Sequence, residues 1–204
     1  MNNDLKSTYN RIAEEWHKDH HKDSWWVLGT DKFVSLLKPN DLVLDVGCGG
    51  GVKSKYLIKK GLKIVGIDLS EKMIEIAQKE VPDAKFLVAD ITKPLEFDEK
   101  FDGIFAQAVL LHIYKKDIKK VIGNLASLLK PGGYLYVAVK GLRDGQNEEQ
   151  IIRENDYGYE YERFFSFYTL EDLNSYMKEL GMDNIYNNVV SIGKTDWIQV
   201  IAKK

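Results

Sequence analysis

Residues 42–51 read Leu-Val-Leu-Asp-Val-Gly-Cys-Gly-Gly-Gly, and this stretch decides the fold. Its first half is a short apolar run, typical of a buried parallel strand. Its glycines lead into residues 52–57, which can form a helix. Glycine accepts positive φ and lets a ligand approach the backbone, so a strand that turns through glycines into a helix is typical of nucleotide binding. Asp45, at the strand end, is the first fixed charge beside such a ligand.

The composition predicts one domain spanning residues 1–204. The hydrophobic fraction is 44% and the charged fraction 29%, as in ordinary globular proteins. A net charge of −2 offers no basic surplus, so we expect no nucleic-acid partner. The single cysteine, Cys48, excludes an intramolecular disulfide and fits a reducing compartment. We find neither an apolar run long enough for a membrane helix nor the apolar core of a signal peptide, and therefore expect a cytoplasmic protein without a membrane partner. The oligomeric state stays open.

Strand-like and helix-like segments alternate along the chain. Apolar runs predict strands over residues 42–46, 63–67, 85–88, 102–106, 134–139, 184–190 and 196–202. Helical spacing predicts an amphipathic N-terminal helix carrying Leu5 to Trp16, and helices over residues 31–37, 52–61, 71–80, 118–129 and 170–180. This alternation implies right-handed crossovers and a doubly wound α/β sheet. The last two strands are joined by a short turn at Gly193 and must be antiparallel.

Polar side chains close four of the predicted strands. They are Asp45, Asp68, Asp90 and Gln107. In doubly wound sheets the ligand lies outside the carboxyl ends of the strands. Any one of the carboxylates could be only a helix cap, but three of them beside a glycine loop favour a ligand. Because no Gly-Lys-Ser/Thr loop is present to bind phosphates, we expect a nucleoside without phosphates. The nearby carboxylates favour a ligand that carries positive charge. Asp68, at the end of the second strand, can accept hydrogen bonds from the hydroxyls of the ligand's ribose.

The spacing Asp45-x-Gly47-x-Gly49-x-Gly51 after an apolar strand resembles motif I of the class I S-adenosylmethionine-dependent methyltransferases that act on small molecules. The resemblance covers residues 41–139. It implies a Rossmann-like, doubly wound sheet of seven strands, mostly parallel with an antiparallel C-terminal strand. It also implies S-adenosylmethionine as cofactor, with the ribose on Asp68 and the adenine beside Asp90 and Ile91. The predicted cofactor-binding residues are Asp45, Gly47, Cys48, Gly49, Gly51, Asp68, Leu69, Asp90, Ile91 and Gln107.

The same resemblance divides the domain into four parts. Residues 1–40 form a helical lead-in, residues 41–139 the cofactor-binding core, residues 140–168 a substrate lid, and residues 169–204 a C-terminal helix and hairpin. The lead-in either lies across the cofactor mouth or only caps the core, and the aromatic-rich lid either encloses the substrate or plugs the sheet edge. The predicted substrate-binding residues are Tyr9, Trp16, Tyr161, Arg163 and Phe165. Aromatic faces favour a small organic acceptor, aromatic or amine-bearing.

The implied reaction is in-line displacement of a methyl group from a sulfonium by the acceptor. The protein supplies orientation and a dry site, and a base is needed only if the nucleophile arrives protonated. His112 is the candidate catalytic base, or else a packed histidine at a helix start. The spacing of His17, His20 and His21 would suit a metal, but a solvated helix end is favoured and no metal is predicted. We interpret Cys48 as a small packing residue and not as a nucleophile.

Three other functions stay open. The chain could be a non-catalytic S-adenosylmethionine-binding protein, since no catalytic residue is obligatory for this chemistry. An NAD(P)-binding oxidoreductase is disfavoured by Asp90 and by Val52, which stands where the dinucleotide fingerprint needs its third glycine. An RNA or DNA methyltransferase is disfavoured because the sequence lacks an Asn/Asp-Pro-Pro-Tyr/Phe motif and a basic patch.

Overall fold

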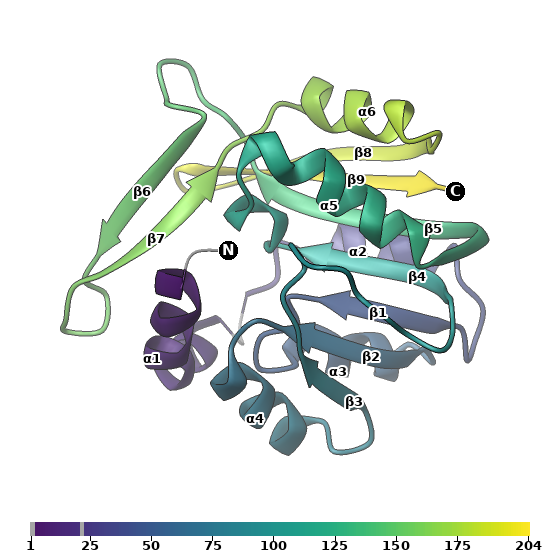
Figure 1. The fold of residues 1–204 in the computed structure, drawn as a ribbon, viewed down its shortest axis with the longest axis horizontal. Coiled ribbons are helices and arrows are strands. Elements are labelled where there is room, and N and C mark those ends of the chain that lie inside the picture. The colour runs from purple at the N-terminus through teal and green to yellow at the C-terminus, as the bar shows by residue number, and fades with distance from the viewer. Residues whose placement is uncertain (1–2, 21–22) are drawn as a thin grey trace.

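A seven-stranded sheet forms the centre of the protein in the computed structural model, which describes residues 3–20 and 23–204 (Figure 1). Its strands are β1 (Leu42–Val46), β2 (Lys63–Asp68), β3 (Lys85–Val88), β4 (Phe101–Gln107), β5 (Leu129–Lys140), β8 (Asp183–Ile192) and β9 (Thr195–Lys203). Their order is β3-β2-β1-β4-β5-β9-β8. Strands β1 to β5 pair in parallel, whereas β9 pairs antiparallel with both β5 and β8. The predicted fold class is therefore confirmed, including the last strand inserted antiparallel to its neighbours.

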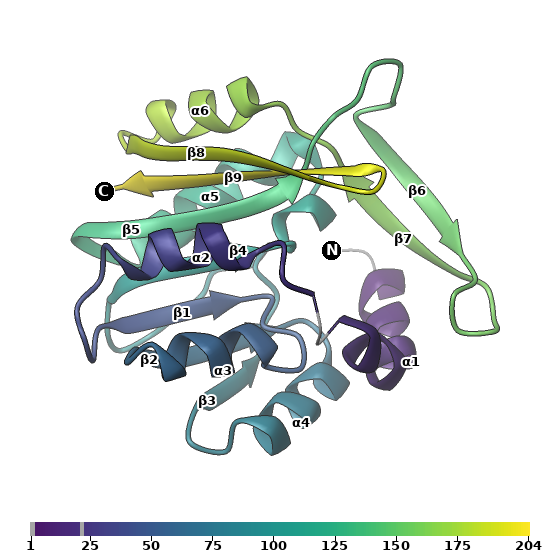
Figure 2. The ribbon, with the colours of Figure 1, turned by 180° about the vertical axis from the view of Figure 1, so that it is seen from behind.

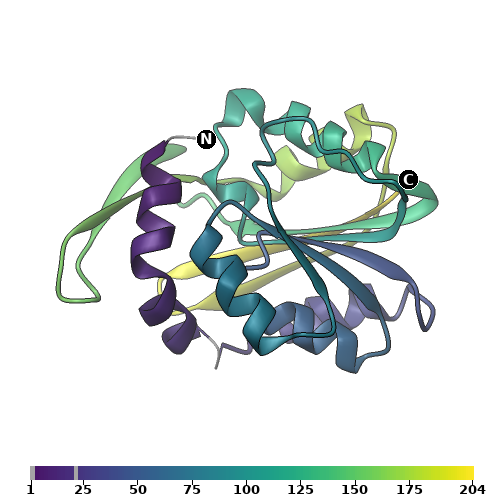
Figure 3. The same ribbon diagram turned by 60° about the horizontal axis from the view of Figure 1, so that its bottom comes forward.

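Helices cover both faces of this sheet (Figures 2 and 3). They are α1 (Asn3–His20), α2 (Val27–Val34), α3 (Val52–Lys59), α4 (Glu71–Glu80), α5 (Lys115–Ser127) and α6 (Leu170–Glu179), with a 3₁₀ turn η1 (Leu110–His112). Successive side chains of a strand face opposite sides, so Leu44 packs with the residues of α5 and α6 while Val43 packs with those of α2 and α3. Both faces of the sheet are thus buried, which explains the apolar runs that predicted its strands.

Side-chain caps begin two of the helices where the sequence indicates them. The Ser70 hydroxyl accepts a hydrogen bond from the Met73 N–H at the start of α4. Thr169 and Asp172 form a reciprocal capping box at the start of α6. Such caps satisfy backbone N–H groups that have no partner inside the helix, which is why the predicted starts of these helices are correct.

Two predicted boundaries are wrong. The helix expected over residues 31–37 is α2, which begins at Val27, ahead of any side-chain cap, because Gly29, Thr30 and Phe33 form its buried face. The strand expected over residues 134–139 is β5, which begins at Leu129 and so includes residues 131–133. The pairing of β5 with β4 absorbs them by a shift in register between Leu129 and Tyr134. Packing against the sheet overrides the local signal in both places.

A separate two-stranded hairpin stands beside the sheet and comprises β6 (Glu149–Glu154) and β7 (Tyr161–Ser166) (Figure 1). It lies against α1, where Thr8 Oγ1 donates to the Glu162 carbonyl at 3.2 Å and the Arg11 guanidinium lies 3.9 Å from the centre of the Tyr159 ring. Helix α1 also contacts α4. We call α1 together with the β6–β7 hairpin the roof. The segment predicted as a substrate lid, residues 140–168, contains this hairpin.

Across residues 3–20 and 23–204, the helices are all too short or too polar to cross a lipid bilayer.

Candidate functional site

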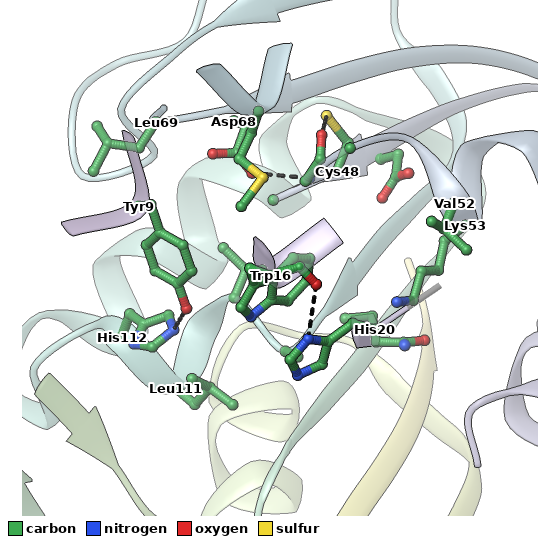
Figure 4. Close-up of a pocket in the computed structure, with 18 of the residues that line it drawn as sticks. Tyr9, Trp16, His20, Cys48, Val52, Lys53, Asp68, Leu69, Leu111 and His112 are labelled. Carbon is green, nitrogen blue, oxygen red and sulfur yellow. Dashed lines mark hydrogen bonds between the residues drawn. The ribbon is translucent and has the colours of Figure 1, made fainter. Parts of the chain in front are cut away.

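A cavity lies at the carboxyl ends of β1, β2, β4 and β5, beneath the roof (Figure 4). The glycine loop forms one wall, and η1 and the end of β5 form another. Tyr9 and Trp16 reach it from α1, and Arg163 and Phe165 reach it from β7. The strand order reverses between β1 and β4, and a crevice opens at such a switch point because the crossovers on either side run in opposite directions. The topology therefore places the cavity where doubly wound sheets bind ligands.

The glycine loop is held open by backbone geometry and by one carboxylate. Gly47 and Gly49 have φ values of +69° and +52°, which L side chains adopt only with strain. Asp68, at the end of β2, accepts hydrogen bonds at 2.9 Å from the backbone N–H groups of Gly49 and Ser70. Burial raises the pKa of Asp68, and these N–H donors counter the rise. Asp68 thus joins the loop to the second strand while it lines the cavity.

Asp45 is a buried carboxylate in the wall of the cavity, where Asp68 is half-buried. Its Oδ2 accepts a hydrogen bond of 2.5 Å from the Ser54 hydroxyl of α3. Burial raises the pKa of Asp45 to about 6, and the Ser54 hydroxyl and the Lys53 ammonium act against that rise. A carboxylate held in this way is stabilised by any positively charged ligand that enters the cavity.

Two polar atoms in the cavity wall are buried without a hydrogen-bond partner among the described residues. They are Oε1 of Gln107, at the end of β4, and Nε1 of Trp16. Buried polar atoms are paired in most native structures, so an orphaned pair in one cavity indicates a polar ligand. The Trp16 ring also lies over the glycine loop, since a Cβ built on Gly49 would be 3.3 Å from its edge.

His112 joins the roof to the sheet through a short chain of hydrogen bonds. Its Nδ1 lies 2.7 Å from the Phe164 carbonyl and its Nε2 lies 2.7 Å from the Tyr9 hydroxyl (Figure 4). Since a carbonyl only accepts, Nδ1 carries the proton and Nε2 accepts from Tyr9. Burial, followed by the Arg163 charge, outweighs the Phe164 carbonyl and lowers the pKa of His112 to about 3. The ring is therefore neutral at physiological pH.

Arg163 completes this chain from β7. Its Nε and one terminal nitrogen donate to the two carboxylate oxygens of Glu154 at 2.6 and 2.5 Å. Its other terminal nitrogen donates to the Tyr9 hydroxyl at 3.2 Å. The Tyr9 oxygen thus accepts from Arg163 and donates to His112, which fixes it at the wall of the cavity.

Residues 43–133 match the model of a methyltransferase domain family. This is the segment that holds the glycine loop and the strand ends described above. Over this segment the chain is therefore similar to a methyltransferase domain.

Curated relatives of the chain include enzymes of two acceptor classes. The ubiquinone biosynthesis O-methyltransferase of Coxiella burnetii is 37% identical over 145 residues, which are 63% of this chain and 58% of the relative. Phosphoethanolamine N-methyltransferase 1 of Zea mays is 31% identical over 182 residues, which are 86% of this chain and 34% of the relative. The chain thus spans only part of the length of either relative.

Solved methyltransferase structures share the fold across nearly the whole chain. The 1,6-didemethyltoxoflavin-N1-methyltransferase of Burkholderia thailandensis, solved with its substrate and S-adenosylhomocysteine, has a TM-score of 0.78 at 16% identity and covers 98% of this chain, with 87% of its own length matched. The magnesium protoporphyrin IX methyltransferase of Synechocystis PCC 6803, solved with S-adenosylhomocysteine, has a TM-score of 0.73 at 18% identity and covers 98% of each chain. At these identities the likeness concerns the fold.

Most residues predicted for the site line the cavity. They are Asp45, Gly47, Cys48, Gly49, Asp68, Leu69, Ile91, Gln107, Tyr9, Trp16, Arg163, Phe165 and His112. Three lie outside its wall. Gly51 packs against Ala77 of α4, Asp90 accepts from the backbone and hydroxyl of Thr92, and the Tyr161 hydroxyl donates to Asp156. Ligand contacts by all of these residues stay predictions.

Cys48 is buried beside Phe86 and Ala77, in agreement with a packing role. Burial raises the pKa of its thiol well above the usual value, which disfavours the nucleophilic thiolate. Within the described part of the chain, no group of three histidine, cysteine or carboxylate side chains could hold a metal ion. His21, one of three histidines considered for a metal, lies outside the described residues.

Two lysines of the cavity wall were missed in the sequence. Lys53 follows the glycine loop at the start of α3, and burial lowers its pKa while Asp23 and Asp45 act against that change. Lys140 ends β5. Neither belongs to a motif, and exposed lysines are common at such positions. The position of Lys140 directly after an apolar strand, where Asp45 and Asp68 end their own strands, was the available signal.

Proposed function

We propose that the protein is an S-adenosylmethionine-dependent methyltransferase that transfers a methyl group to a small organic acceptor by in-line displacement. The observation that carries the proposal is the cavity at the switch point, where Asp45, Asp68 and the unpaired Gln107 amide oxygen meet the glycine loop. The two carboxylates favour a positively charged nucleoside over a phosphate-bearing one. The free Cys48 fits a cytoplasmic setting.

The residues of the cavity suit the parts of this cofactor. S-adenosylmethionine, when bound, supplies an activated methyl group on a positively charged sulfur. Asp68 would accept hydrogen bonds from its ribose hydroxyls. Asp45 and Gln107 offer acceptors for its ammonium group, and Lys53 offers a cation for its carboxylate. The loop at Gly47 and Gly49 lets the ligand approach the backbone closely, since neither residue has a Cβ.

Proton removal from the acceptor is proposed to pass through Tyr9 to His112. The Nε2 lone pair of His112 already accepts a hydrogen bond from the Tyr9 hydroxyl. The histidine can therefore take a proton from an acceptor only through the Tyr9 oxygen. An acceptor that gives its proton to the Tyr9 oxygen allows Tyr9 to pass its own proton to Nε2, and His112 then becomes a transient imidazolium, a form that its burial disfavours. The Arg163 guanidinium, hydrogen-bonded to the same oxygen, stabilises the negative charge that develops there.

Binding and transfer test the proposal separately. Calorimetric titrations should show micromolar binding of S-adenosylmethionine and S-adenosylhomocysteine and little binding of NAD. In the variant Asp68→Ala both cofactor affinities should fall, by about 2–4 kcal/mol for two charge-assisted hydrogen bonds. Tighter binding of NAD than of either ligand would refute the proposal.

Transfer is then measured with labelled methyl donor and a panel of acceptors. The panel includes phosphoethanolamine and ubiquinone precursors, the acceptor classes in the names of the relatives. Methylation of any acceptor in the panel supports the proposed methyltransferase activity. Tight cofactor binding with no transfer to any acceptor favours the non-catalytic cofactor-binding protein.

A further inference from the structure

Lys140 is a positive charge without an anionic partner at the acceptor end of the cavity. It is the last residue of β5, two positions beyond Ala138, which pairs with Gln107 of β4. Its side chain is half-buried and lines the cavity. Among the described residues its ammonium makes no ion pair or hydrogen bond, and its contact is with the ring of Phe165, 4.0 Å from the ring centre. An ammonium sheltered from water without a counter-ion is unfavourable.

The neighbouring cation, Arg163, is held in place by other groups. Its guanidinium lies 5.1 Å from the centre of the same Phe165 ring. Glu154 compensates its charge through the paired hydrogen bonds described above. Lys140 therefore keeps its charge uncompensated beside a rigid second cation, and His112, which is neutral, adds no negative charge to this end.

The cavity is electrically polarised as a result. At the glycine-loop end the carboxylates of Asp23, Asp45 and Asp68 outnumber the one ammonium, that of Lys53. The cations Lys140 and Arg163 stand at the end formed by β5 and β7. Burial lowers the pKa of Lys140, the nearby Arg163 charge lowers it in the same direction, and together they bring it to about 8. The Glu154 carboxylate acts to raise the pKa but does not outweigh them. An anion at this end would remove both the desolvation cost and the repulsion between the two cations.

We propose that the acceptor carries an anionic group, a phosphate, phosphonate or carboxylate, which Lys140 and Arg163 bind at the carboxyl end of β5. This inference rests on the proposed function, whose acceptor class it narrows. The anion anchors one end of the acceptor, and the rings of Tyr9 and Phe165 confine the rest beside the methyl-transfer point.

The test measures small anions on the full chain saturated with S-adenosylhomocysteine. Inorganic phosphate, acetate and neutral acetamide are titrated by calorimetry into the wild type, Lys140→Met, Lys140→Arg and a control, Lys63→Met. Lys63 is an exposed lysine at the opposite end of a strand of the same sheet. The wild type, Lys140→Arg and Lys63→Met should bind an anion, Lys140→Met should bind it at least about tenfold more weakly, and acetamide should not bind. Tighter binding of phosphate than of acetate indicates an acceptor with a phosphate or phosphonate group, and the reverse preference indicates an acceptor with a carboxylate.

Two results would overturn the inference: equal anion affinity in Lys140→Met and the wild type, or acetamide binding as tightly as acetate. If Lys140→Met does not fold, the wild type decides through its pH dependence. The charged groups that act on Lys140 are Arg163 and Glu154, and burial lowers the pKa of Lys140 to about 8. Acetate affinity should therefore fall between about pH 7 and 9.5 as Lys140 loses its proton, and a constant affinity counts against the site.

The control for the proposed function is S-adenosylhomocysteine titrated alone. Cofactor binding without Lys140-dependent anion binding refutes the anion site and leaves the methyltransferase proposal standing. Lys140-dependent anion binding to a protein that does not bind the cofactor refutes the methyltransferase proposal and leaves the anion site standing.

Discussion

Asp45 and His112 are both buried beside the cavity, and burial disfavours the charged form of each. For Asp45 the pKa rises from 3.8 to about 6, so its contribution to stability is present below pH 3.8 and is lost as the pH rises through 6. For His112 the pKa falls from 6.5 to about 3, so its contribution is present above pH 6.5 and is lost as the pH falls toward 3. Between pH 4 and 6 the two contributions oppose each other, and separate variants are needed to see either.

The variant Asp45→Asn should be more stable than the wild type at pH 7.5. It removes a buried charge but keeps an oxygen that can accept from Ser54. The free energy of unfolding, measured by urea denaturation without cofactor, should rise by about 1–3 kcal/mol. The gain should shrink by about half at pH 5, where the wild-type carboxyl is mostly protonated. Cofactor affinity should fall in the same variant, and a variant that is destabilised at pH 7.5 contradicts the assignment.

His112 should be a neutral imidazole with its proton on Nδ1 at pH 5.5. The Phe164 carbonyl requires that tautomer, and burial keeps the ring neutral at this pH in the protein without acceptor. Nitrogen-15 NMR of the imidazole distinguishes the two tautomers from the imidazolium. A doubly protonated ring at pH 5.5, or a proton on Nε2, would contradict the proposed route through Tyr9.

The glycine loop is the element on which the site depends, because it must turn tightly and leave room for a ligand. Gly47 and Gly61 both have positive φ, at +69° and +92°. They differ in their neighbours: a Cβ on Gly47 would lie 2.6 Å from the Val109 Cβ, whereas one on Gly61 would meet nothing within 4 Å. Backbone strain and steric fit can therefore be separated by one pair of substitutions.

Gly61→Ala should cost about 1–2 kcal/mol of unfolding free energy, the cost of a left-handed residue with a Cβ. Gly47→Ala should cost clearly more, about 3 kcal/mol or above, since the short branched Val109 side chain cannot move its Cβ aside. Both are measured by urea denaturation. Gly47→Ala should also lose cofactor binding while Gly61→Ala retains it. Equal losses of stability would mean that the contact with Val109 relaxes at little cost.

At the scale of the whole molecule the protein has a buried sheet and a more exposed roof. The sheet is covered on both faces, whereas the strands of the hairpin are mostly exposed or half-buried. The roof is held by contacts from α1 to α4 and from α1 to β7, through hydrogen bonds such as that between Thr8 and Glu162. Local opening is easiest where few apolar contacts must break, so the roof is the part that can open to admit ligands.

Hydrogen exchange should show this division. Without ligand, amides of α1 and of the β6–β7 hairpin should exchange faster than those of β1, β4 and β5. Saturation with S-adenosylhomocysteine should slow exchange in α1, which lies over the cavity, and leave α5 on the outer face of the sheet unchanged. Equal protection of α1 with and without ligand would show that the roof does not close over the cofactor.

The sequence alone determined the sheet, the glycine loop and the carboxylates that end its strands. These features depend on local signals: apolar runs for strands buried on both faces, glycines where φ is positive, and Ser70 and Thr169 as helix caps. Asp45, Asp68 and Gln107 reach the cavity because the carboxyl ends of parallel strands meet at one edge of the sheet. For such residues the position in the chain implies the position in space.

The resemblance to a family predicted Tyr9, Arg163 and His112 one by one, but only the tertiary structure decided how they meet at the other end of the site. Tyr9 and His112 are 103 residues apart in the chain, and Tyr9 and Arg163 are 154 apart. The hairpin that carries Arg163 has no fully buried face, so its strands left no strong apolar pattern. Asp90 turns to the nearby Thr92, and Lys140 turns into the cavity, although both follow apolar strands. Where a polar side chain points at a strand end depends on which distant segment packs over it, and local sequence does not contain that information.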